Sequence, residues 1–358
     1  MAPRFHRLTI GDLRRETAGA VSIAFDVPAD LAQAYAFQPG QYLTLKAVID
    51  GAEIRRSYSI CSGPADGELR IGVKRVEGGV FSPWAAEHLK PGDRVEAMTP
   101  VGRFGAGALA PGARTTLGIA AGSGITPLLS IMKAVLGASP DHRFILVYGN
   151  RSTAEIMFRS TLEALKDRYL SRLSVFHVLS REDQDLAILN GRLNGPKLKT
   201  LLPALLPVAA IDQALICGPA AMNAQAELSL RELGVPEQAI QVERFVSEAG
   251  GAPRQRPATT APMDAAAFAV AITADGKTRT VAVGPDQTIL DAALSAGLDL
   301  PYACKGGMCT TCRAKSAGGP VTMERNYSLE PWELQAGFVL TCQAHPHGNG
   351  VRIDFDAV

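Results

Sequence analysis

Four cysteines near the carboxyl end of the chain have a spacing that suits an iron–sulfur cluster. Cys304, Cys309 and Cys312 form a C-x4-C-x2-C segment, and Cys342 follows after twenty-nine further residues. This is the plant-type spacing for a 2Fe–2S cluster, which transfers single electrons at low potential. The alternatives are a zinc site or buried free thiols, although structural zinc usually uses two paired knuckles and only one C-x2-C is present. We predict a 2Fe–2S cluster held by these four thiolates.

The residues around the cysteines also suit a cluster. Gly306 and Gly307 allow backbone angles that other residues avoid and let amide N–H groups approach the sulfurs closely. Thr310 and Thr311 can donate hydroxyl hydrogen bonds. The apolar run 338–340 is expected to bring the fourth cysteine in from a separate segment.

A glycine-containing turn in the middle of the chain predicts a phosphate site. The segment 120–127 lies between a strand-like and a helix-like stretch and contains Gly122, Ser123, Gly124 and Thr126, followed by Pro127. The amides at such a helix start favour an anionic phosphate. A G-x-G pattern without the third glycine of the dinucleotide fingerprint is weak evidence, so a generic tight turn stays open as the alternative.

Two segments of the amino-terminal part have residue types that can serve a flavin. In the segment 56–59, an arginine can pair with phosphate, an aromatic ring can stack on isoalloxazine and a hydroxyl can reach the flavin N5. The later segment 79–82 could place further amides and a hydroxyl on the flavin pyrophosphate. Taken singly, the segment 56–59 is also compatible with an ordinary exposed strand, and the segment 79–82 with a common loop.

Three further sites follow apolar strand-like runs, at the end where ligands bind in parallel sheets. Cys217 closes one run, the pair Ser180-Arg181 ends a second, and Arg151 follows a third. Arginine and serine at strand ends suit the 2′-phosphate of NADPH. The alternatives are a buried structural cysteine and solvated surface arginines. His345 and His347 are expected to be surface residues.

The pattern of short segments predicts a multidomain chain of 358 residues. Strand-like runs at 21–27, 42–48, 56–61, 69–74 and 93–98 favour an antiparallel β-barrel over residues 1–110. Runs at 117–121, 144–148, 173–179 and 214–217 alternate with helical stretches and favour an α/β domain with a parallel sheet over 111–246. A Pro-, Gly- and Ala-rich linker is expected at 247–263. Beyond it, a hairpin at 268–273 and 278–283 and a helix at 289–296 precede the cluster loop in a domain spanning 264–358.

Composition limits the function further. The formal net charge is +1, which gives no sign of binding to nucleic acid or to an anionic membrane. No run of eighteen apolar residues and no signal-peptide pattern is present. The two remaining cysteines, Cys61 and Cys217, do not suggest a disulfide framework, so we expect a cytoplasmic protein in a reducing compartment.

Jointly, these motifs resemble the ferredoxin–NADP reductase superfamily fused to a plant-type 2Fe–2S ferredoxin. The resemblance covers essentially the whole chain and includes 38–41, 148–151, 216–222, 242–245, 300–304 and 326–331. It implies an FAD-binding β-barrel, an NAD(P)-binding α/β domain and an α+β ferredoxin domain of the β-grasp type. Within the superfamily the likeness is greatest to reductases that serve a multi-subunit di-iron epoxidase.

For the flavin, the resemblance implies a role for each matching position. Arg56, Tyr58 and Ser59 match an R-x-Y-S motif, here with Ser57 as its variable residue, that holds FAD and places Ser59 near N5. The second flavin segment is matched by Lys74, Gly79, Val80, Phe81 and Ser82.

For the nucleotide, the resemblance implies that residues 122–126 hold the pyrophosphate and that Ser180 and Arg181, supported by Arg151, select NADPH. Cys217 matches a cysteine that lies against the nicotinamide. Glu243 and Phe245 match residues near the outer face of the flavin, but the family aromatic is usually Tyr and the chain here continues beyond it.

These cofactors form a relay, because a nicotinamide gives up two electrons together, a 2Fe–2S cluster accepts one at a time, and a flavin can do both. We therefore predict an NAD(P)H-dependent oxidoreductase with Ser59, Cys217 and Glu243 at the hydride-transfer site. The chain has no E-x-x-H pairs of the di-iron type, so a separate oxygenase component is the expected partner. The alternatives are the reductase of an alkane, steroid or aromatic-ring system, or a redox sensor.

Overall fold

The computed structural model of the chain describes residues 4–110, 112, 114–245 and 267–357. The described residues divide into two compact units. One holds Arg7–Leu43 and Tyr58–Phe245, and the other includes Thr44–Ser57 and the carboxyl-terminal part. The predicted linker at 247–263 lies outside the described residues, and the boundaries at 110 and 246 stay predictions.

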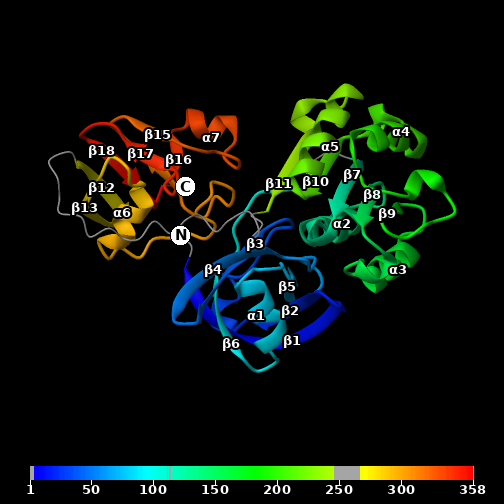
Figure 1. The fold of residues 1–358 in the computed structure, drawn as a ribbon, viewed down its shortest axis with the longest axis horizontal. Coiled ribbons are helices and arrows are strands. Elements are labelled where there is room, and N and C mark those ends of the chain that lie inside the picture. The colour runs from blue at the N-terminus through cyan, green and yellow to red at the C-terminus, as the bar shows by residue number, and fades with distance from the viewer. Residues whose placement is uncertain (1–3, 111, 113, 246–266, 358) are drawn as a thin grey trace. The chain divides into compact units, whose positions relative to one another are not determined.

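Six strands form the antiparallel sheet of the FAD barrel, in the order β4-β3-β6-β1-β2-β5 (Figure 1). They are β1 (Phe5–Thr17), β2 (Ala20–Asp26), β3 (Tyr42–Ile49), β4 (Ala52–Ser59), β5 (Leu69–Lys74) and β6 (Arg94–Met98). The predicted strand at 69–74 has the observed bounds, and those at 21–27, 42–48 and 93–98 are confirmed within a residue or so. The strand expected at 56–61 instead runs from Ala52 to Ser59. A short helix, α1 (Phe81–His88), follows β5.

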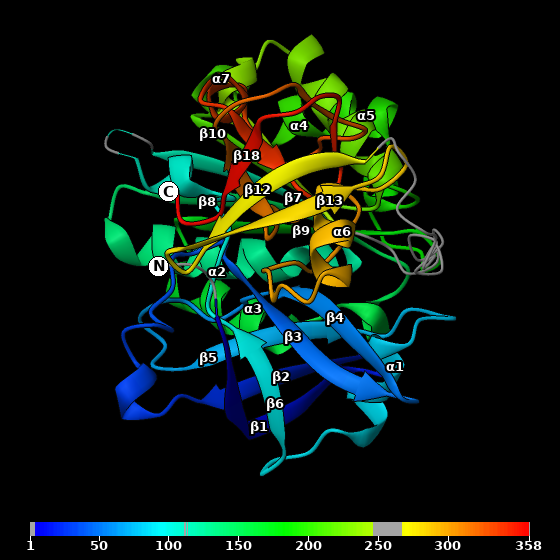
Figure 2. The same cartoon turned by 90° about the vertical axis from the view of Figure 1, so that its left-hand side faces the viewer.

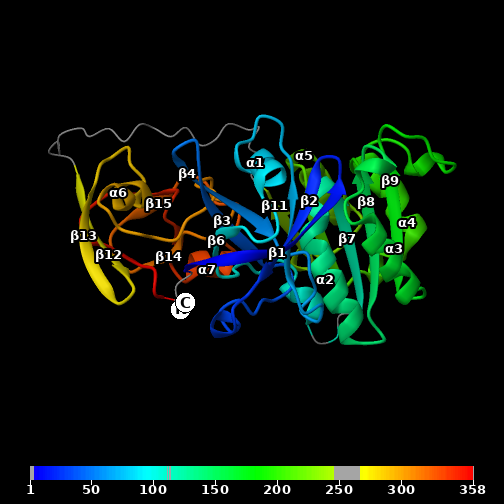
Figure 3. The same cartoon turned by 90° about the horizontal axis from the view of Figure 1, so that it is seen from below.

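A parallel five-stranded sheet forms the nucleotide domain, in the order β11-β10-β7-β8-β9. Its strands are β7 (Thr115–Ala121), β8 (Arg143–Asn150), β9 (Leu173–Leu179), β10 (Gln213–Gly218) and β11 (Ile240–Arg244). Its helices are α2 (Ile125–Ala138), α3 (Arg159–Arg168), α4 (Gly195–Leu205) and α5 (Ala220–Glu232). Figure 3 shows β7, β8 and β9 side by side.

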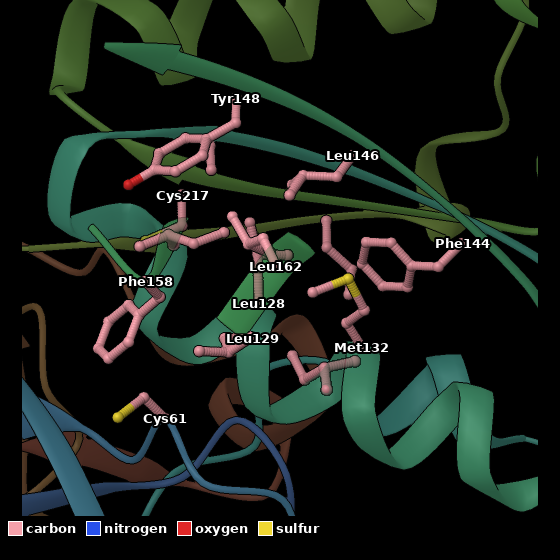
Figure 4. Packing of buried hydrophobic residues seen from close by; sticks show 14 of the residues in the cluster. Cys61, Leu128, Leu129, Met132, Phe144, Leu146, Tyr148, Phe158, Leu162 and Cys217 are labelled. Atoms are coloured by element: carbon pink, nitrogen blue, oxygen red, sulfur yellow. The ribbon is translucent and has the colours of Figure 1, made fainter. Parts of the chain in front are cut away.

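Alternation along the strands of this sheet separates two cores. On β8, Phe144, Leu146 and Tyr148 pack in one cluster with residues of α2 and α3, as Figure 4 shows. The intervening Ile145 and Val147 pack in another cluster with residues of α4 and α5. A strand that is buried on both faces needs apolar side chains on both, and this explains why the sequence of β8 is a nearly continuous apolar run. The predicted parallel sheet with helices on both faces is confirmed.

The cluster domain has a five-stranded sheet in the order β13-β12-β18-β14-β16 and a two-stranded sheet of β15 and β17. Its strands are β12 (Phe268–Ala274), β13 (Lys277–Val283), β14 (Arg313–Ser316), β15 (Val321–Met323), β16 (Phe338–Leu340), β17 (Ala344–Pro346) and β18 (Val351–Asp354). Its helices are α6 (Ile289–Ser295) and α7 (Pro331–Gln335). Figure 2 shows the predicted hairpin as β12 and β13, with β18 beside β12.

Two details of this domain matter for the site. Thr288 begins α6 by accepting a hydrogen bond from the amide of Asp291, as a helix N-cap does. Strand β16 lies two residues before Cys342, so the expected role of the 338–340 run in delivering the fourth cysteine is confirmed. Among the described residues, none of the helices has the length and apolar character needed to cross a membrane.

Candidate functional site

The nucleotide turn lies at the carboxyl end of β7, where Gly122–Gly124 form one turn of 3-10 helix that leads into α2. Gly122 has a φ of +54°, a conformation that favours glycine. The hydroxyl of Thr126 donates to the Ser123 carbonyl at 2.9 Å, and the buried Tyr148 donates its hydroxyl to the Gly122 carbonyl at 2.9 Å. The turn is thereby held with its backbone amides at a helix start, where a phosphate is favourably placed.

Gly124 packs directly on the end of β10. A Cβ atom on this residue would lie 1.9 Å from the Cys217 carbonyl oxygen, so only glycine allows the approach. The contact joins the phosphate turn to the strand that ends in Cys217. Two segments almost a hundred residues apart in the sequence therefore meet at one edge of the parallel sheet.

Cys217 and Glu243 are neighbours in the parallel pairing of β10 and β11. Cys217 is fully buried, and burial, with a further contribution from Glu243, raises the pKa of its thiol well above the ordinary value. Part of the Glu243 side chain is accessible, yet burial of its carboxyl raises its pKa to about 8. Both groups are therefore uncharged at neutral pH. Asn223 on α5 donates to the Glu243 carbonyl at 3.1 Å and helps to hold the end of β11.

The predicted 2′-phosphate residues come together at the ends of β8 and β9. The amide of Arg181 donates to the Arg151 carbonyl at 2.8 Å, and that of Ser180 donates to the Asn150 carbonyl at 3.0 Å. Both arginine side chains are exposed. The carboxylate of Glu182 accepts from the amide and hydroxyl of Thr153, which lowers its pKa and gives its charge a local partner. The sheet edge therefore has two exposed arginine cations, of which Arg151 lies 3.8 Å from the Glu155 carboxylate, and a phosphate monoester requires such cations.

The structure brings the two flavin segments into contact. The rings of Tyr58 and Phe81 are 5.7 Å apart between centroids, which joins β4 to the start of α1. Phe81 is fully buried, so its ring packs in the interior of the barrel domain. The buried Ser82 hydroxyl accepts from the Val76 amide at 3.1 Å. Gly79 and Val80 directly precede the helix, and Phe81 and Ser82 begin it, so the predicted flavin segment lies at a helix start.

The remaining flavin residues have different surroundings. Ser59 is buried at the end of β4. Ser57 lies on the same strand with its hydroxyl 3.1 Å from that of Thr44, and Arg56 donates to the Arg55 carbonyl at 2.8 Å. Phe245, which follows β11, is exposed.

Lys74, expected with the second flavin segment, lies beside the nucleotide turn. Its ammonium nitrogen is 3.1 Å from where a Cβ atom on Gly122 would be. Burial lowers the pKa of this lysine. The phosphate turn therefore has a cation next to its backbone amides, which sequence spacing alone did not indicate.

The four cluster cysteines are arranged as two interacting pairs. The Cys304 thiol is hydrogen-bonded with that of Cys309, which lowers the pKa of Cys304 to about 6 and raises that of Cys309. Cys312 and Cys342 form the second pair, in which the pKa of Cys342 is lowered and that of Cys312 raised. Within the part of the chain that the structure describes, no three His, Cys, Asp or Glu side chains converge as they would on a single ion. Two thiol pairs fit a core of two irons held by four cysteines.

Backbone amides surround these sulfurs, as the glycine content of the loop predicted. The amides of Gly306 and Met308 donate to the Cys304 sulfur at 3.3 and 3.4 Å, and the Cys304 amide donates to the Cys309 sulfur at 3.4 Å. The Thr311 hydroxyl is hydrogen-bonded to Cys309. Such donors stabilise the negative charge of a reduced cluster. The residues present therefore fit a 2Fe–2S cluster.

Comparison with known families supports all three domains. Residues 17–105 match the oxidoreductase FAD-binding domain, 119–227 match the oxidoreductase NAD-binding domain, and 272–347 match the 2Fe-2S iron-sulfur cluster binding domain. The chain belongs to the family of oxidoreductases that serve oxygenases as reductase components and combine these three domains in one polypeptide. An oxygenase partner and a nicotinamide nucleotide substrate follow from this membership.

Individual relatives extend over the whole chain. It is 47% identical over 354 residues to a subunit of 1,2-phenylacetyl-CoA epoxidase from Escherichia coli (strain K12), covering 99% of this chain and 98% of the relative. It is 32% identical to the ferredoxin reductase component of 3-ketosteroid-9-alpha-monooxygenase from Rhodococcus rhodochrous, covering 97% and 96%. The structure of phthalate dioxygenase reductase, 22% identical, matches 98% of each chain with a TM-score of 0.57, and so shares the fold.

Sequence reasoning missed several supporting residues of the site. Tyr148 was placed only on a strand, Asn223 was not singled out, and Gln343 beside the fourth cysteine was overlooked. Tyr148 ends an apolar run directly before a glycine, a position from which a hydroxyl can reach the sheet edge. Nothing in the sequence distinguishes Asn223 from other polar residues on helix surfaces.

Proposed function

We propose that this chain transfers electrons from NADPH, through FAD and the 2Fe–2S cluster, to the multi-subunit di-iron oxygenase of a phenylacetyl-CoA epoxidase system in phenylacetate catabolism. The observation that supports this is the 47% identity to the epoxidase subunit from Escherichia coli over nearly the full length of both chains. FAD, when bound, accepts the pair of electrons that the nicotinamide gives up and releases them singly. The protein supplies binding, orientation and electrostatics.

The nucleotide is proposed to bind along the carboxyl edge of the parallel sheet. The amides of residues 122–126 and the ammonium of Lys74 hold its pyrophosphate, because they place N–H donors and a cation at the start of α2. Arg181 and Ser180, with Arg151 alongside, bind the 2′-phosphate. Lys74 is thus assigned to the nucleotide turn as well as to the flavin segment.

The hydride-transfer site is proposed to comprise Ser59, Cys217 and Glu243. Since the pKa of Cys217 is raised well above the ordinary range, its thiol stays neutral and packs against the nicotinamide without acting as a nucleophile. The Glu243 carboxyl, with a pKa raised to about 8 by burial, is protonated at neutral pH and can donate a hydrogen bond. Positive charge that develops on the nicotinamide favours its carboxylate form.

The flavin is proposed to lie on the barrel between its two segments. Arg56 and Ser57 on β4, together with Gly79, Val80 and the start of α1, bind its phosphates, while Tyr58 stacks on the ring system. The ring contact between Tyr58 and Phe81 supports this, because it brings one residue of each segment together. Phe245 is assigned to the outer face of the flavin, where its exposed ring can be displaced by the nicotinamide.

Arg181→Ala tests the nucleotide assignment. The loss of one charge-assisted contact unique to NADPH is expected to raise its KM by about tenfold to a hundredfold. The KM for NADH, which lacks the 2′-phosphate, should change little. Steady-state kinetics with cytochrome c as acceptor measures both values.

The matched control is Arg143→Ala, which removes an exposed arginine at the opposite end of β8. It should leave both KM values unchanged. Equal rises for NADPH and NADH in Arg181→Ala would count against a role in selecting the phosphate.

Reconstitution tests the proposed partner. The purified reductase, loaded with FAD and cluster, should support NADPH-dependent epoxidation of phenylacetyl-CoA by the oxygenase subunits of that system. Product formation per NADPH consumed is the measurement. Rapid cytochrome c reduction without epoxidation would reject this partner, whereas no turnover by fully loaded protein would favour a redox sensor.

A steroid oxygenase is the second candidate partner. It is supported by the ketosteroid monooxygenase reductases, which match this chain over almost its full length at 32–34% identity. The lower identity places it behind the epoxidase. The same reconstitution with ketosteroid oxygenase and its substrate decides between the two.

A further inference from the structure

The side-chain amide nitrogen of Gln343, the residue after the fourth cysteine, contacts two carbonyls and a cysteine sulfur. Gln343 is 6% exposed, and its side-chain amide nitrogen donates to the carbonyls of Cys342 at 2.8 Å and of Lys305 at 3.0 Å. The same nitrogen lies 3.6 Å from the Cys342 sulfur, within the range of N–H···S hydrogen bonds. One buried amide therefore contacts both cluster-binding segments.

The two carbonyl contacts join segments that are far apart in the sequence. Lys305 follows the first cluster cysteine and has a φ of +49°, and Gln343 follows the fourth, thirty-eight positions later. The Gln343 stem also packs under the loop, because a Cβ atom on Gly307 would lie 3.2 Å from its Cγ. The hydrogen bond from this amide to the Lys305 carbonyl holds the positive-φ turn in place. It thereby fixes the position of the Cys304 sulfur relative to Cys342.

The third contact bears on the redox chemistry. An amide has two hydrogens, and the two carbonyls accept them, so the Cys342 sulfur at 3.6 Å can only share one of them and faces the positive end of the amide dipole. A reduced cluster is more negative than an oxidised one, and hydrogen bonds to its sulfurs help to set the reduction potential. The positive end of an amide dipole beside a ligand sulfur therefore favours the reduced form.

We propose that Gln343 is a positioning residue that ties the two cluster-binding segments together and raises the reduction potential of the cluster through the positive end of its amide dipole, which faces the Cys342 sulfur. The inference rests on the electron-relay function proposed above, since the potential governs how readily the cluster accepts electrons from the flavin. Without this donor the cluster would be a weaker acceptor.

The test is an EPR-monitored redox titration of the full chain, loaded with FAD and cluster. Gln343→Met replaces the amide by an apolar side chain of similar length. At a fixed applied potential near the midpoint, the ratio of reduced to oxidised cluster is expected to fall about tenfold, which equals about 59 mV for one electron. The matched control is Gln335→Met, the same change at an exposed glutamine on α7, and its potential should match that of the unaltered chain.

If Gln343→Met binds no cluster, the same titration is made on a second variant, Gln343→Asn. It keeps the amide on a stem one methylene shorter, so it should load the cluster and show a smaller fall in the ratio. If Gln343→Met binds the cluster and its reduction potential is unchanged, the proposal is overturned. If only Gln343→Asn binds the cluster, an unchanged potential in that variant overturns it. Failure of every Gln343 variant to load would show that the side chain supports only the fold, and would overturn it too.

These readouts do not involve an oxygenase. An unaltered potential would reject the role of Gln343 and leave the proposed partner untouched. Conversely, failure to support epoxidation would reject the partner while the potential still tests Gln343.

Discussion

Replacing Cys312 by serine is expected to abolish cytochrome c reduction while leaving reduction of the bound FAD by NADPH intact. Cys312 is almost fully buried and pairs with Cys342, so a serine hydroxyl there removes one of the four thiolates that we propose hold the iron. The nucleotide turn and the second flavin segment, 79–82, lie outside the compact unit that holds Cys312, and they should keep their contacts. The substitution should therefore prevent only the transfer of electrons from the flavin to the cluster.

Two measurements separate these steps. Stopped-flow absorbance at the flavin band should show reduction by NADPH at the rate of the unaltered protein. The cytochrome c assay should fall to the rate of flavin-loaded protein that lacks a cluster, and the EPR signal after dithionite should disappear. Loss of flavin reduction as well, in a folded variant loaded with FAD, would contradict the proposed order of the relay.

Cys61→Ser is the matched control. Cys61 is a buried cysteine of the barrel whose thiol donates to the Arg70 carbonyl at 3.4 Å, and burial raises its pKa to about 12. A serine can make the same hydrogen bond, and the residue is not a cluster ligand. The variant should retain the cluster signal and full cytochrome c reduction.

The parts of the fold that sequence predicted well are those set by local patterns. The strands at 69–74 and 173–179 have the observed bounds. In the first, Leu69, Ile71 and Val73 alternate with other residues at the period of a strand, and the second is mostly apolar. The 2Fe–2S domain was also predictable, since three of the four cysteines lie on one short loop, and the role of each cysteine as a ligand stays a prediction. Strand β1 was missed because its pairing with β2 is irregular around Gly11, between Ile10 and Asp12, which breaks the alternation that marks a strand.

The parts that could not be predicted depend on contacts between distant segments. Nothing in the residues near Lys74 indicates that its ammonium lies by Gly122, because this follows from the packing of β5 against the nucleotide turn. The pairing of Cys217 with Glu243 depends on the register of β10 and β11, which only the resemblance suggested. The raised pKa of Glu243 also depends on contacts between distant segments, because the burial that raises it cannot be predicted from the sequence of one strand.

The close approach of Gly124 to β10 leads to the other large expected effect. Gly124→Ala would place a methyl group 1.9 Å from the Cys217 carbonyl oxygen, and backbone cannot rotate away as a flexible side chain can. The turn or the strand end must move, which displaces either the amides proposed to bind the phosphate or the thiol proposed to face the nicotinamide. A misplacement of about 1 Å at such a site can cost about a hundredfold in rate, so kcat/KM for NADPH should fall by at least that order.

Gly137→Ala provides the comparison, because it makes the same substitution later in α2, where a Cβ atom would meet nothing within 4 Å. Alanine is the better helix former, so this variant should be slightly more stable and fully active. Dithionite bypasses the nucleotide site and should reduce FAD and cluster normally in both variants. If NADPH reduced the flavin of Gly124→Ala at an undiminished rate, the turn could not be the pyrophosphate site. A defect that appeared with dithionite as well would instead mean that the flavin or cluster domain had been damaged.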